Sequence, residues 1–378
     1  MNVDRIELRL VRMQLRSPFQ TSFGTEVERE CIIISVHGDG LTGWGECVAS
    51  RGFAGAGSPQ LDWNLYSYET TQTAWHILRD FLIPQVIRRP LSVEYMVELG
   101  TRLRGHPLAR AGLEAAVWDI TAQIENISLS RALGGARDKV PVGVSIGIQP
   151  SVDALVAQVD DYLSQGYRRI KIKIKPGFDL EPVKAIRTKH PSILFQVDAN
   201  SAYTLADAPL FEAMDEHKLL LIEQPLGWDD LYDHSKLQPR LRTPICLDES
   251  IHSVGHARLA IELGATRVIN IKPGRVSGFT ESRRIHDVCQ SAGVPVWCGG
   301  MLETGIGRAG NVAMASLPGF TLPGDISASD RYYVEDIVDP PFALNPDSTI
   351  DVPRGPGLGV TVNLQRLDAV TVKRDVFG

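Results

Sequence analysis

Three short apolar runs decide the fold: LFQVD at residues 194–198, LLLIE at 219–223 and PICLD at 244–248. Each run has the pattern of a β-strand that ends on a carboxylate, and the three carboxylates stand 25 residues apart. That period accommodates one strand, one covering helix and two short loops. The carboxyl ends of successive parallel strands meet at one edge, so the period predicts that Asp198, Glu223 and Asp248 converge there.

Two lysines flank this series. Lys173 lies 25 residues before Asp198, and Lys272 lies 24 residues after Asp248 and follows the apolar run VINI at 268–271. The same period predicts that both lysines enter the site, on opposite sides of the carboxylates. Two bases that face each other across a bound substrate can remove a proton from one face and return one from the other.

A third lysine, Lys171, precedes Lys173 by two residues. Residues two apart in a strand point to the same side, so both ammonium groups are expected to face the same way. Two like charges held close lower each other's pKa, which would make one of these lysines a usable base near neutral pH. An amphipathic strand with two surface lysines accounts for the same pattern, so the pair alone leaves both interpretations open.

The three carboxylates also predict a metal. Asp198, Glu223 and Asp248 offer only oxygen ligands, since no His or Cys stands at an equivalent position. Oxygen-only sets suit Mg²⁺ or Mn²⁺, whereas zinc sites usually recruit His or Cys. Three clustered carboxylates without a cation would repel one another. We therefore expect Mg²⁺, with Mn²⁺ as a substitute, and free coordination positions for substrate and water.

Strand-like and helical runs alternate from about residue 140 onward. Helices are expected at 152–165 and 180–189. Strands are expected at 142–145, 169–173, 194–198, 219–223, 245–248, 267–272 and 294–298. This α/β alternation implies a parallel sheet with right-handed crossovers. The number of units favours a TIM-like barrel of the modified (β/α)8 type, written (β/α)7β.

The rest of the chain has a different pattern. Residues 1–135 combine alternating, strand-like runs with helical stretches, which predicts an α+β capping domain. Two loops in it, at about 17–25 and 51–58, are expected to form a lid. The barrel is expected over 136–325, and the segment 326–378 is expected to return to the capping domain.

Composition excludes several classes of protein. The 378 residues are 43% hydrophobic and 22% charged, as in an ordinary globular protein. The net charge of −6 and the absence of a Lys/Arg cluster argue against a nucleic-acid partner. No apolar run is long enough for a membrane span. Five cysteines without a C-x-x-C pair predict free thiols and a cytoplasmic location.

Longer motifs surround these residues: KIK at 171–173 with PGFD at 176–179, DAN at 198–200, EQP at 223–225, DES at 248–250, KPGR at 272–275, GGMLETGIGR at 299–308 and PGD at 323–325. Through them the sequence resembles the enolase superfamily, in its muconate-lactonizing subgroup. Within that subgroup it is most similar to the o-succinylbenzoate synthase / N-succinylamino acid racemase family. The resemblance covers nearly the whole chain, including the capping domain.

The resemblance implies a role for each site residue. It makes Lys173 the acid or base on one face with Lys171 assisting it, and Lys272 the group on the other face. It implies that Mg²⁺ is held by Asp198, Glu223 and Asp248. It implies a substrate pocket that includes Ser145, Asn200, Glu249, Gly300 and Met301, with Phe19, Phe23 and the loop at 52–57 as the lid. Arg275, three residues beyond Lys272, is expected to tune that lysine and is counted with the substrate-binding residues.

The implied reaction is abstraction of a proton next to a carboxylate. In the synthase, the enediolate then loses water by syn β-elimination and gives o-succinylbenzoate, a step of menaquinone biosynthesis. We expect this activity on a small-molecule carboxylate, with N-succinylamino acid racemase activity beside it, and association into a homo-oligomer. A dedicated N-acylamino acid racemase and a muconate cycloisomerase remain alternatives. A barrel that only binds a small acid is disfavoured, because binding does not require two opposed bases.

Overall fold

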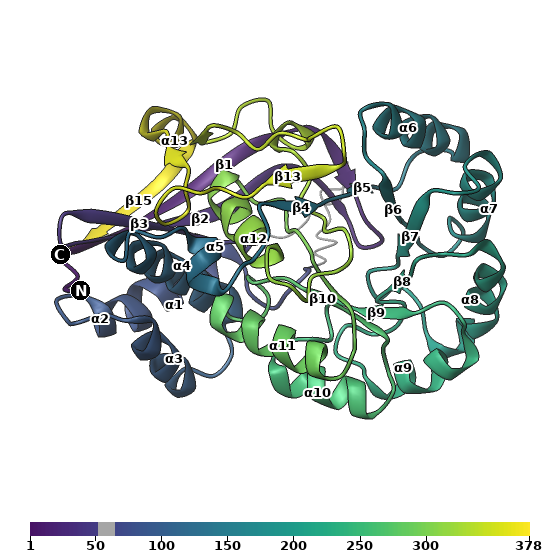
Figure 1. Cartoon of the computed structure of the whole chain (residues 1–378), viewed down its shortest axis with the longest axis horizontal. Helices are drawn as coiled ribbons and strands as arrows, with labels where there is room; N and C mark the ends of the chain where they lie inside the picture. The colour runs from purple at the N-terminus through teal and green to yellow at the C-terminus, as the bar shows by residue number, and fades with distance from the viewer. Residues whose placement is uncertain (52–64) are drawn as a thin grey trace.

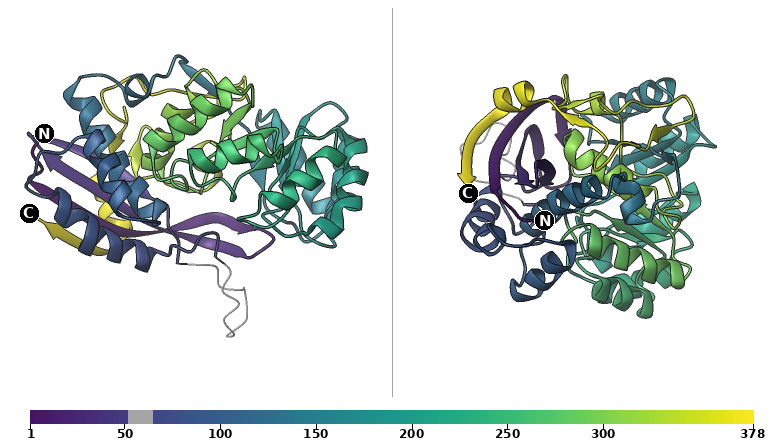
Figure 2. Two further views of the ribbon diagram at one scale, coloured as in Figure 1. Left: turned by 90° about the horizontal axis from the view of Figure 1, so that it is seen from below. Right: turned by 60° about the vertical axis from the view of Figure 1, so that its left-hand side comes forward.

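The computed structural model of the chain describes residues 1–51 and 65–378, so most of the predicted lid loop at 51–58 lies outside the described residues. The described chain forms two units that pack against each other (Figure 1). One is a curved antiparallel sheet with its helices, and the other is an open ring of parallel strands with helices outside. Both termini lie at the far end of the antiparallel sheet (Figure 2).

The capping domain is built on four antiparallel strands in the order β15-β1-β2-β3. They are β1 (Arg5–Gln20), β2 (Thr25–Gly38), β3 (Leu41–Cys47) and β15 (Thr371–Phe377). On the covered face of β1, the side chains of Ile6 and Leu8 are fully buried. Strand β15 pairs with β1 from Ile6 opposite Phe377 to Val11 opposite Thr371, so the end of the chain completes the first sheet.

Helices cover one face of this sheet, and α4 makes the closest contact. A Cβ atom on Gly45 of β3 would lie 2.1 Å from the Gly112 carbonyl oxygen of α4, and one on Gly43 would lie 2.2 Å from that of Ala116. Strand and helix therefore meet backbone to backbone, which only glycine permits here. The helical segments of this unit are α1 (Thr71–Ile77), the π-helix η1 (Leu78–Leu82), α2 (Ile83–Val86), α3 (Val93–Arg102), α4 (Pro107–Ile124) and α5 (Leu129–Leu133).

The second unit contains seven parallel strands in sequence order, which confirms the predicted TIM-like fold with a capping domain. The strands are β5 (Val144–Ile146), β6 (Arg169–Lys173), β7 (Leu194–Asp198), β8 (Ile222–Glu223), β9 (Ile245–Leu247), β10 (Val268–Ile271) and β11 (Val296–Cys298). The covering helices are α6 (Val152–Ser164), α7 (Leu180–Lys189), α8 (Ala208–Met214), α9 (Tyr232–Leu237), α10 (Val254–Glu262), α11 (Phe279–Ser291) and α12 (Gly305–Ala315). None of the helices in the described ranges is long and apolar enough to cross a membrane.

An irregular segment stands where an eighth strand would close the barrel. The regular sheet runs only from β5 to β11. Between these two edges, Phe320 forms a bridge with Val296 and Gly324 forms one with Val142, both parallel. Residues 320–325 therefore occupy the eighth position without regular strand geometry.

Several strands are shorter than the sequence predicted. The expected strand at 219–223 is regular only at Ile222 and Glu223, and Lys218 before it has a left-handed backbone (φ 49°). The expected strand at 142–145 lies instead at Val144–Ile146. The remaining elements are β4 (Lys139–Pro141), β12 (Val338–Asp339), β13 (Thr349–Asp351), β14 (Thr361–Val362), α13 (Leu364–Val370) and the 3₁₀ turns η2 (Leu205–Asp207), η3 (Asp215–His217), η4 (Gln238–Arg240) and η5 (Ser329–Arg331).

Two buried glutamates connect the capping domain to the barrel. Glu46 of β3 accepts hydrogen bonds from the Thr304 hydroxyl at 2.7 Å and from the Gly307 N–H at 3.0 Å, at the start of α12. Glu114 of α4 accepts one from the Phe279 N–H at 2.6 Å, at the start of α11. The unpaired N–H groups of a helix N-terminus favour a negative or strongly accepting partner. These contacts hold the capping domain over the barrel.

The Glu46 contact predicts a pH-dependent stability. Burial raises the pKa of Glu46 to about 7, although hydrogen bonds from Thr304 oppose the shift. The folded chain thus retains a proton that the unfolded chain releases near the ordinary value of 4.5. The stabilisation is complete below that value and is lost as the pH rises through about 7.

The Glu46→Gln variant cannot ionise at this position. Between pH 5 and pH 8, we therefore expect the free energy of unfolding to fall by about 2 kcal/mol more in the wild type than in Glu46→Gln. Thermal unfolding midpoints of both proteins at the two pH values measure this difference. The same pH-dependent fall in both proteins would contradict the assignment.

Candidate active site

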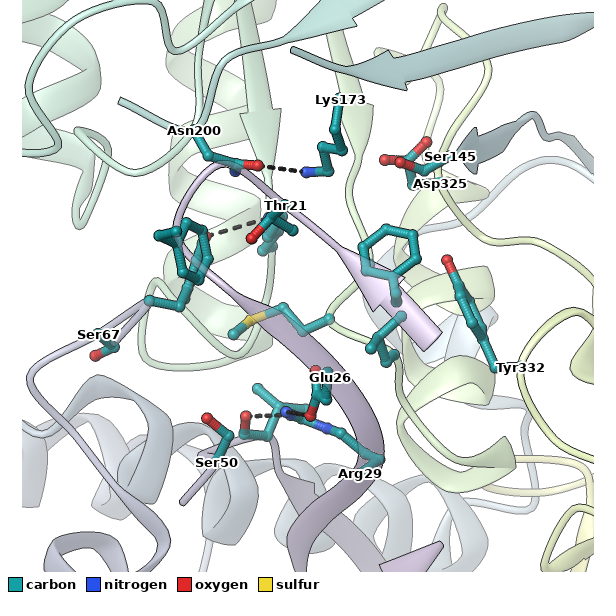
Figure 3. Close-up of a pocket in the computed structure, with 18 of the residues that line it drawn as sticks. Thr21, Glu26, Arg29, Ser50, Ser67, Ser145, Lys173, Asn200, Asp325 and Tyr332 are labelled. Carbon is teal, nitrogen blue, oxygen red and sulfur yellow. Dashed lines mark hydrogen bonds and ion pairs between the residues drawn. The ribbon is translucent and has the colours of Figure 1, made fainter. Parts of the chain in front are cut away.

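A cavity lies where the carboxyl ends of the barrel strands meet the capping domain. Figure 3 shows Lys173 and Asn200 at one end of it, with the side chains of the capping domain facing them. The predicted site residues that line the cavity are Phe19, Phe23, Ser145, Lys171, Lys173, Asn200, Lys272, Gly300 and Met301. The sequence therefore predicted much of the lining from both units.

The parallel register brings the charged residues to one level of the sheet. Lys173 in β6 stands opposite Asp198 in β7, and Asp198 stands opposite Glu223 in β8. Glu223 pairs in turn with Cys246, two residues before Asp248. Asp198 is 1% exposed, and Glu223 and Asp248 are fully buried. Three carboxylates therefore lie at the ends of three neighbouring strands, away from bulk water.

Each carboxylate is paired with a lysine. The Lys173 ammonium donates to Asp198 at 2.6 Å, Lys171 donates to Glu223 at 2.7 Å, and Lys272 donates to Asp248 at 2.7 Å. Lys171 also lies 3.2 Å from Asp198 and therefore joins two neighbouring acids. In a buried site, such pairs compensate charges that would otherwise be costly.

The expected pKa change at Lys171 does not occur in this arrangement. Burial lowers the pKa of Lys171, but the carboxylates of Asp325, Glu223 and Asp198 outweigh burial and raise it above the ordinary value. The prediction that a neighbouring ammonium group lowers the pKa is therefore wrong for Lys171. Three nearby anions have a larger effect than one nearby cation.

The donor set fits a divalent cation by its chemistry. Asp198, Glu223 and Asp248 offer oxygen ligands and are buried; none of them lines the cavity, but each accepts a hydrogen bond from a lysine that does. In the described residues, no three His, Cys, Asp or Glu side chains are already arranged around a metal position. The ion pairs explain this, because each carboxylate is turned toward an ammonium group. A cation held by these acids would supply charge that the lysines supply here.

Two of the predicted substrate contacts lie behind the cavity wall. Glu249 accepts a hydrogen bond from the Asn200 amide at 2.9 Å and thus orients a residue that does line the cavity. Arg275 forms an ion pair with Asp248 and donates to the carbonyl oxygen of Asn270 at 2.6 Å. Neither residue is part of the cavity lining. Arg275 therefore neighbours Lys272 through their shared carboxylate, Asp248.

Tyr66 was not found by sequence reasoning. Its hydroxyl accepts a hydrogen bond from Lys272 at 3.2 Å and lies 3.4 Å from an Asp248 oxygen. The Lys272 ammonium also lies 4.8 Å from the centre of the Tyr66 ring. Burial lowers the pKa of Lys272, but the Tyr66 phenol and nearby carboxylates raise it overall. No spacing in the sequence connects a tyrosine of the capping domain to a barrel lysine.

Asp325 also joins the site. It forms ion pairs with Lys171 at 2.5 Å and with Arg169 at 2.6 Å, and both partners are buried. Asp325 belongs to the irregular segment at 320–325, which has no strand-like pattern in the sequence. The PGD motif at 323–325 was the available signal, although it indicated family membership and no role.

The fold and this site define a class of protein. Residues 5–134 match the family model "Mandelate racemase / muconate lactonizing enzyme, N-terminal domain", and residues 154–366 match "Enolase C-terminal domain-like". A member of the enolase superfamily from Listeria innocua has a crystal structure that superposes with a TM-score of 0.92 at 39% identity, covering 100% of this chain and 99% of that one. The muconate lactonizing enzyme of Pseudomonas fluorescens superposes with a TM-score of 0.89 at 25% identity, over 98% of this chain and 99% of that one.

Curated relatives narrow the class. An o-succinylbenzoate synthase of Geobacillus kaustophilus is 48% identical, covering 100% of this chain and 98% of the relative. An N-succinylamino acid racemase of an Amycolatopsis species is also 48% identical, over the full length of both proteins. The chain therefore belongs to the o-succinylbenzoate synthase / N-succinylamino acid racemase family of the enolase superfamily.

The ion pairs of Asp325 predict a large structural effect. Asp325→Asn leaves the buried cations of Lys171 and Arg169 with less compensating charge, so we expect a loss of about 3 to 5 kcal/mol in the free energy of unfolding. Urea unfolding measures the loss. Asp330→Asn, at an exposed position five residues later, is the matched control and should change stability little. Equal stability of the two variants would contradict the role of Asp325.

Proposed function

We propose that this chain is a hydro-lyase that forms o-succinylbenzoate by eliminating water, and that it also racemises N-succinylamino acids. One observation carries the proposal: Lys173 of β6 and Lys272, directly after β10, both line one cavity, and β7, β8 and β9 lie between their strands. The two lysines thus approach a bound substrate from opposite sides of the carboxylates. Relatives at 48% identity that are named for each activity support the pairing of the two reactions.

Both reactions start with removal of a proton from the carbon next to a carboxylate. Such a proton is weakly acidic, so the negative charge that develops on the carboxylate oxygens must be stabilised as it forms. Lys171, Lys173 and Lys272 provide cations at this end of the cavity. A divalent cation on Asp198, Glu223 and Asp248 would act as a Lewis acid toward those oxygens.

The two reactions differ after the first step. In the synthase reaction, Lys173 removes the proton and then gives it to the departing hydroxyl group, which leaves from the same face as water, while Lys272 remains an ammonium group beside the enediolate. In the racemase reaction, the lysine on the opposite face returns a proton to the same carbon. The aromatic side chains over the cavity, among them Phe19, keep water from protonating the intermediate at random.

Two other activities remain candidates for comparison. A dedicated N-acylamino acid racemase would use the same lysines, so the kcat/KM values for the synthase and racemase substrates must rank the two activities. Muconate cycloisomerase is the weaker candidate, because the Pseudomonas fluorescens enzyme named for muconate shares only 25% identity with this chain. A barrel that binds an acid without turnover would leave both lysines without a chemical role.

The proposal extends to the metal, the cellular location and the assembly of the enzyme. We propose Mg²⁺ as the metal, replaceable by Mn²⁺, because the ligands are carboxylate oxygens. We propose a cytoplasmic enzyme of the menaquinone pathway, and all five cysteines are buried and unpaired, as a reducing compartment allows. The substrate is a small carboxylate, and assembly into a homo-oligomer stays a prediction.

The two-base mechanism predicts the behaviour of single variants. In D₂O, the wild type should exchange the α-proton of both enantiomers of an N-succinylamino acid. Lys173→Ala and Lys272→Ala should each lose racemisation by at least about 100-fold and retain exchange with at most one enantiomer, opposite in the two variants. Proton NMR follows the exchange. If each variant exchanged both enantiomers, the assignment of two opposed bases would be wrong.

Metal removal gives a separate prediction. EDTA treatment should abolish activity, and added Mg²⁺ should restore it. Mg²⁺ should also raise the thermal unfolding midpoint of the wild type, because ligand binding to the folded state stabilises it. Asp198→Asn, with one anionic ligand fewer, should need higher Mg²⁺ concentrations for the same rise. Full activity after exhaustive EDTA treatment would exclude a metal-dependent mechanism.

A further inference from the structure

The end of the cavity opposite the catalytic lysines carries its own charged pair. Figure 3 shows Glu26 and Arg29 of strand β2 at the far side of the cavity from Lys173 and Asn200. Both side chains belong to the cavity lining. The capping domain therefore contributes a cation to a cavity whose other cations all come from the barrel.

Arg29 is buried but incompletely paired. The residue is 4% exposed, and its Nε atom is buried without a hydrogen-bond partner. One terminal nitrogen donates to the Val48 carbonyl oxygen, and the other lies 3.3 Å from Glu26, longer than is usual for a guanidinium–carboxylate contact. A guanidinium has five N–H donors, so this group retains capacity for another acceptor.

Glu26 compensates Arg29 only weakly. The two residues share a single contact at 3.3 Å, and no paired, two-bond geometry is present. Burial raises the pKa of Glu26 above its ordinary value even though Arg29 lies beside it. A weakly held, buried carboxyl leaves much of the arginine's charge available to a ligand.

The proposed substrates require a second cationic position. o-Succinylbenzoate, the product of the synthase reaction, and N-succinylamino acids each carry two carboxylates, and the carboxylate next to the reacting carbon must lie near Lys173 and Lys272. A second carboxylate that enters this cavity loses part of its hydration shell and needs a positive partner. Among the described residues, Lys171, Lys173, Lys272 and Arg29 are the cations that line the cavity. Arg29 is the one that lies apart from the reacting end.

We propose that Arg29 binds the distal carboxylate of a dicarboxylate substrate, and that Glu26 tunes the strength of this contact. This inference rests on the proposed function for the position of the reacting carboxylate. It assigns to the capping domain the selection of succinyl over neutral acyl groups. Arg29 would act on substrate binding and the lysines on proton transfer, at separate ends of one cavity.

The test compares two nearly isosteric substrates. An N-succinylamino acid and its N-succinamoyl analogue differ only in that a neutral amide replaces the distal carboxylate. Exchange of the α-proton in D₂O gives kcat/KM for both. The wild type should prefer the succinyl compound by roughly 10- to 100-fold, as expected for one buried, charge-assisted contact. Because the preference is a ratio measured on one preparation, it does not depend on the fraction of active enzyme.

Variants locate the origin of that preference. Arg29→Met should reduce the preference to near one, mainly by raising KM for the succinyl substrate. Glu26→Gln, which removes a competing anion, should keep or increase it. Arg12→Met is the matched control, since Arg12 belongs to the same sheet, pairs with Glu30 at 2.7 Å and does not line the cavity. It should retain the wild-type preference.

Each outcome has a defined meaning. A wild-type preference near one, or an unchanged preference in Arg29→Met, would overturn the assignment of Arg29. If Arg29→Met does not fold, the wild type and Glu26→Gln decide: a wild-type preference that Glu26→Gln keeps or increases supports the proposal, and one that Glu26→Gln abolishes overturns it. Absence of exchange with every N-acylamino acid would instead contradict the proposed function.

Discussion

The register between β6, β7 and β8 is the constraint on which the site depends. It places Lys173, Asp198 and Glu223 opposite one another at the ends of adjacent strands, where all three side chains are buried. Buried charges of one sign cannot be assembled without charges of the other sign. The three acids, the lysines and the pair formed by Asp325 and Arg169 are therefore one compensated set. Removing any member leaves another buried charge without full compensation in the low-dielectric interior.

The same physical requirement connects the two units. The side chains of Glu46 and Glu114 extend from the capping domain and accept hydrogen bonds at the starts of α12 and α11 in the barrel. Each contact satisfies a buried carboxyl and the unpaired start of a helix at once. The backbone contact between β3 and α4 joins the strand that carries Glu46 to the helix that carries Glu114. The capping domain is thus held in place over the ends of the strands, and its side chains become part of the cavity.

A cavity built from two units separates two tasks. The barrel provides the lysines of the proposed proton transfer and the proposed metal ligands, at or directly after the ends of its parallel strands. The capping domain provides Phe19, Tyr66 and Arg29, of which Tyr66 contacts Lys272 and Arg29 is proposed to bind the part of the substrate that does not react. Changes on the capping side can therefore alter which acyl group binds without disturbing the charged set below.

The sequence by itself determined the fold and the central residues, because a constant period of 25 residues requires that strand ends recur at one edge. Lys173, Lys272 and the three acids follow from that period. Only the tertiary structure decided the remaining contacts. Tyr66, Asp325 and Arg29 come from segments with no periodic relation to the barrel, so their approach depends on how the two units pack. The pKa of Lys171 also depends on the tertiary structure. The carboxylates of Asp325 and Glu223 raise it, and no spacing in the sequence specifies how close they lie.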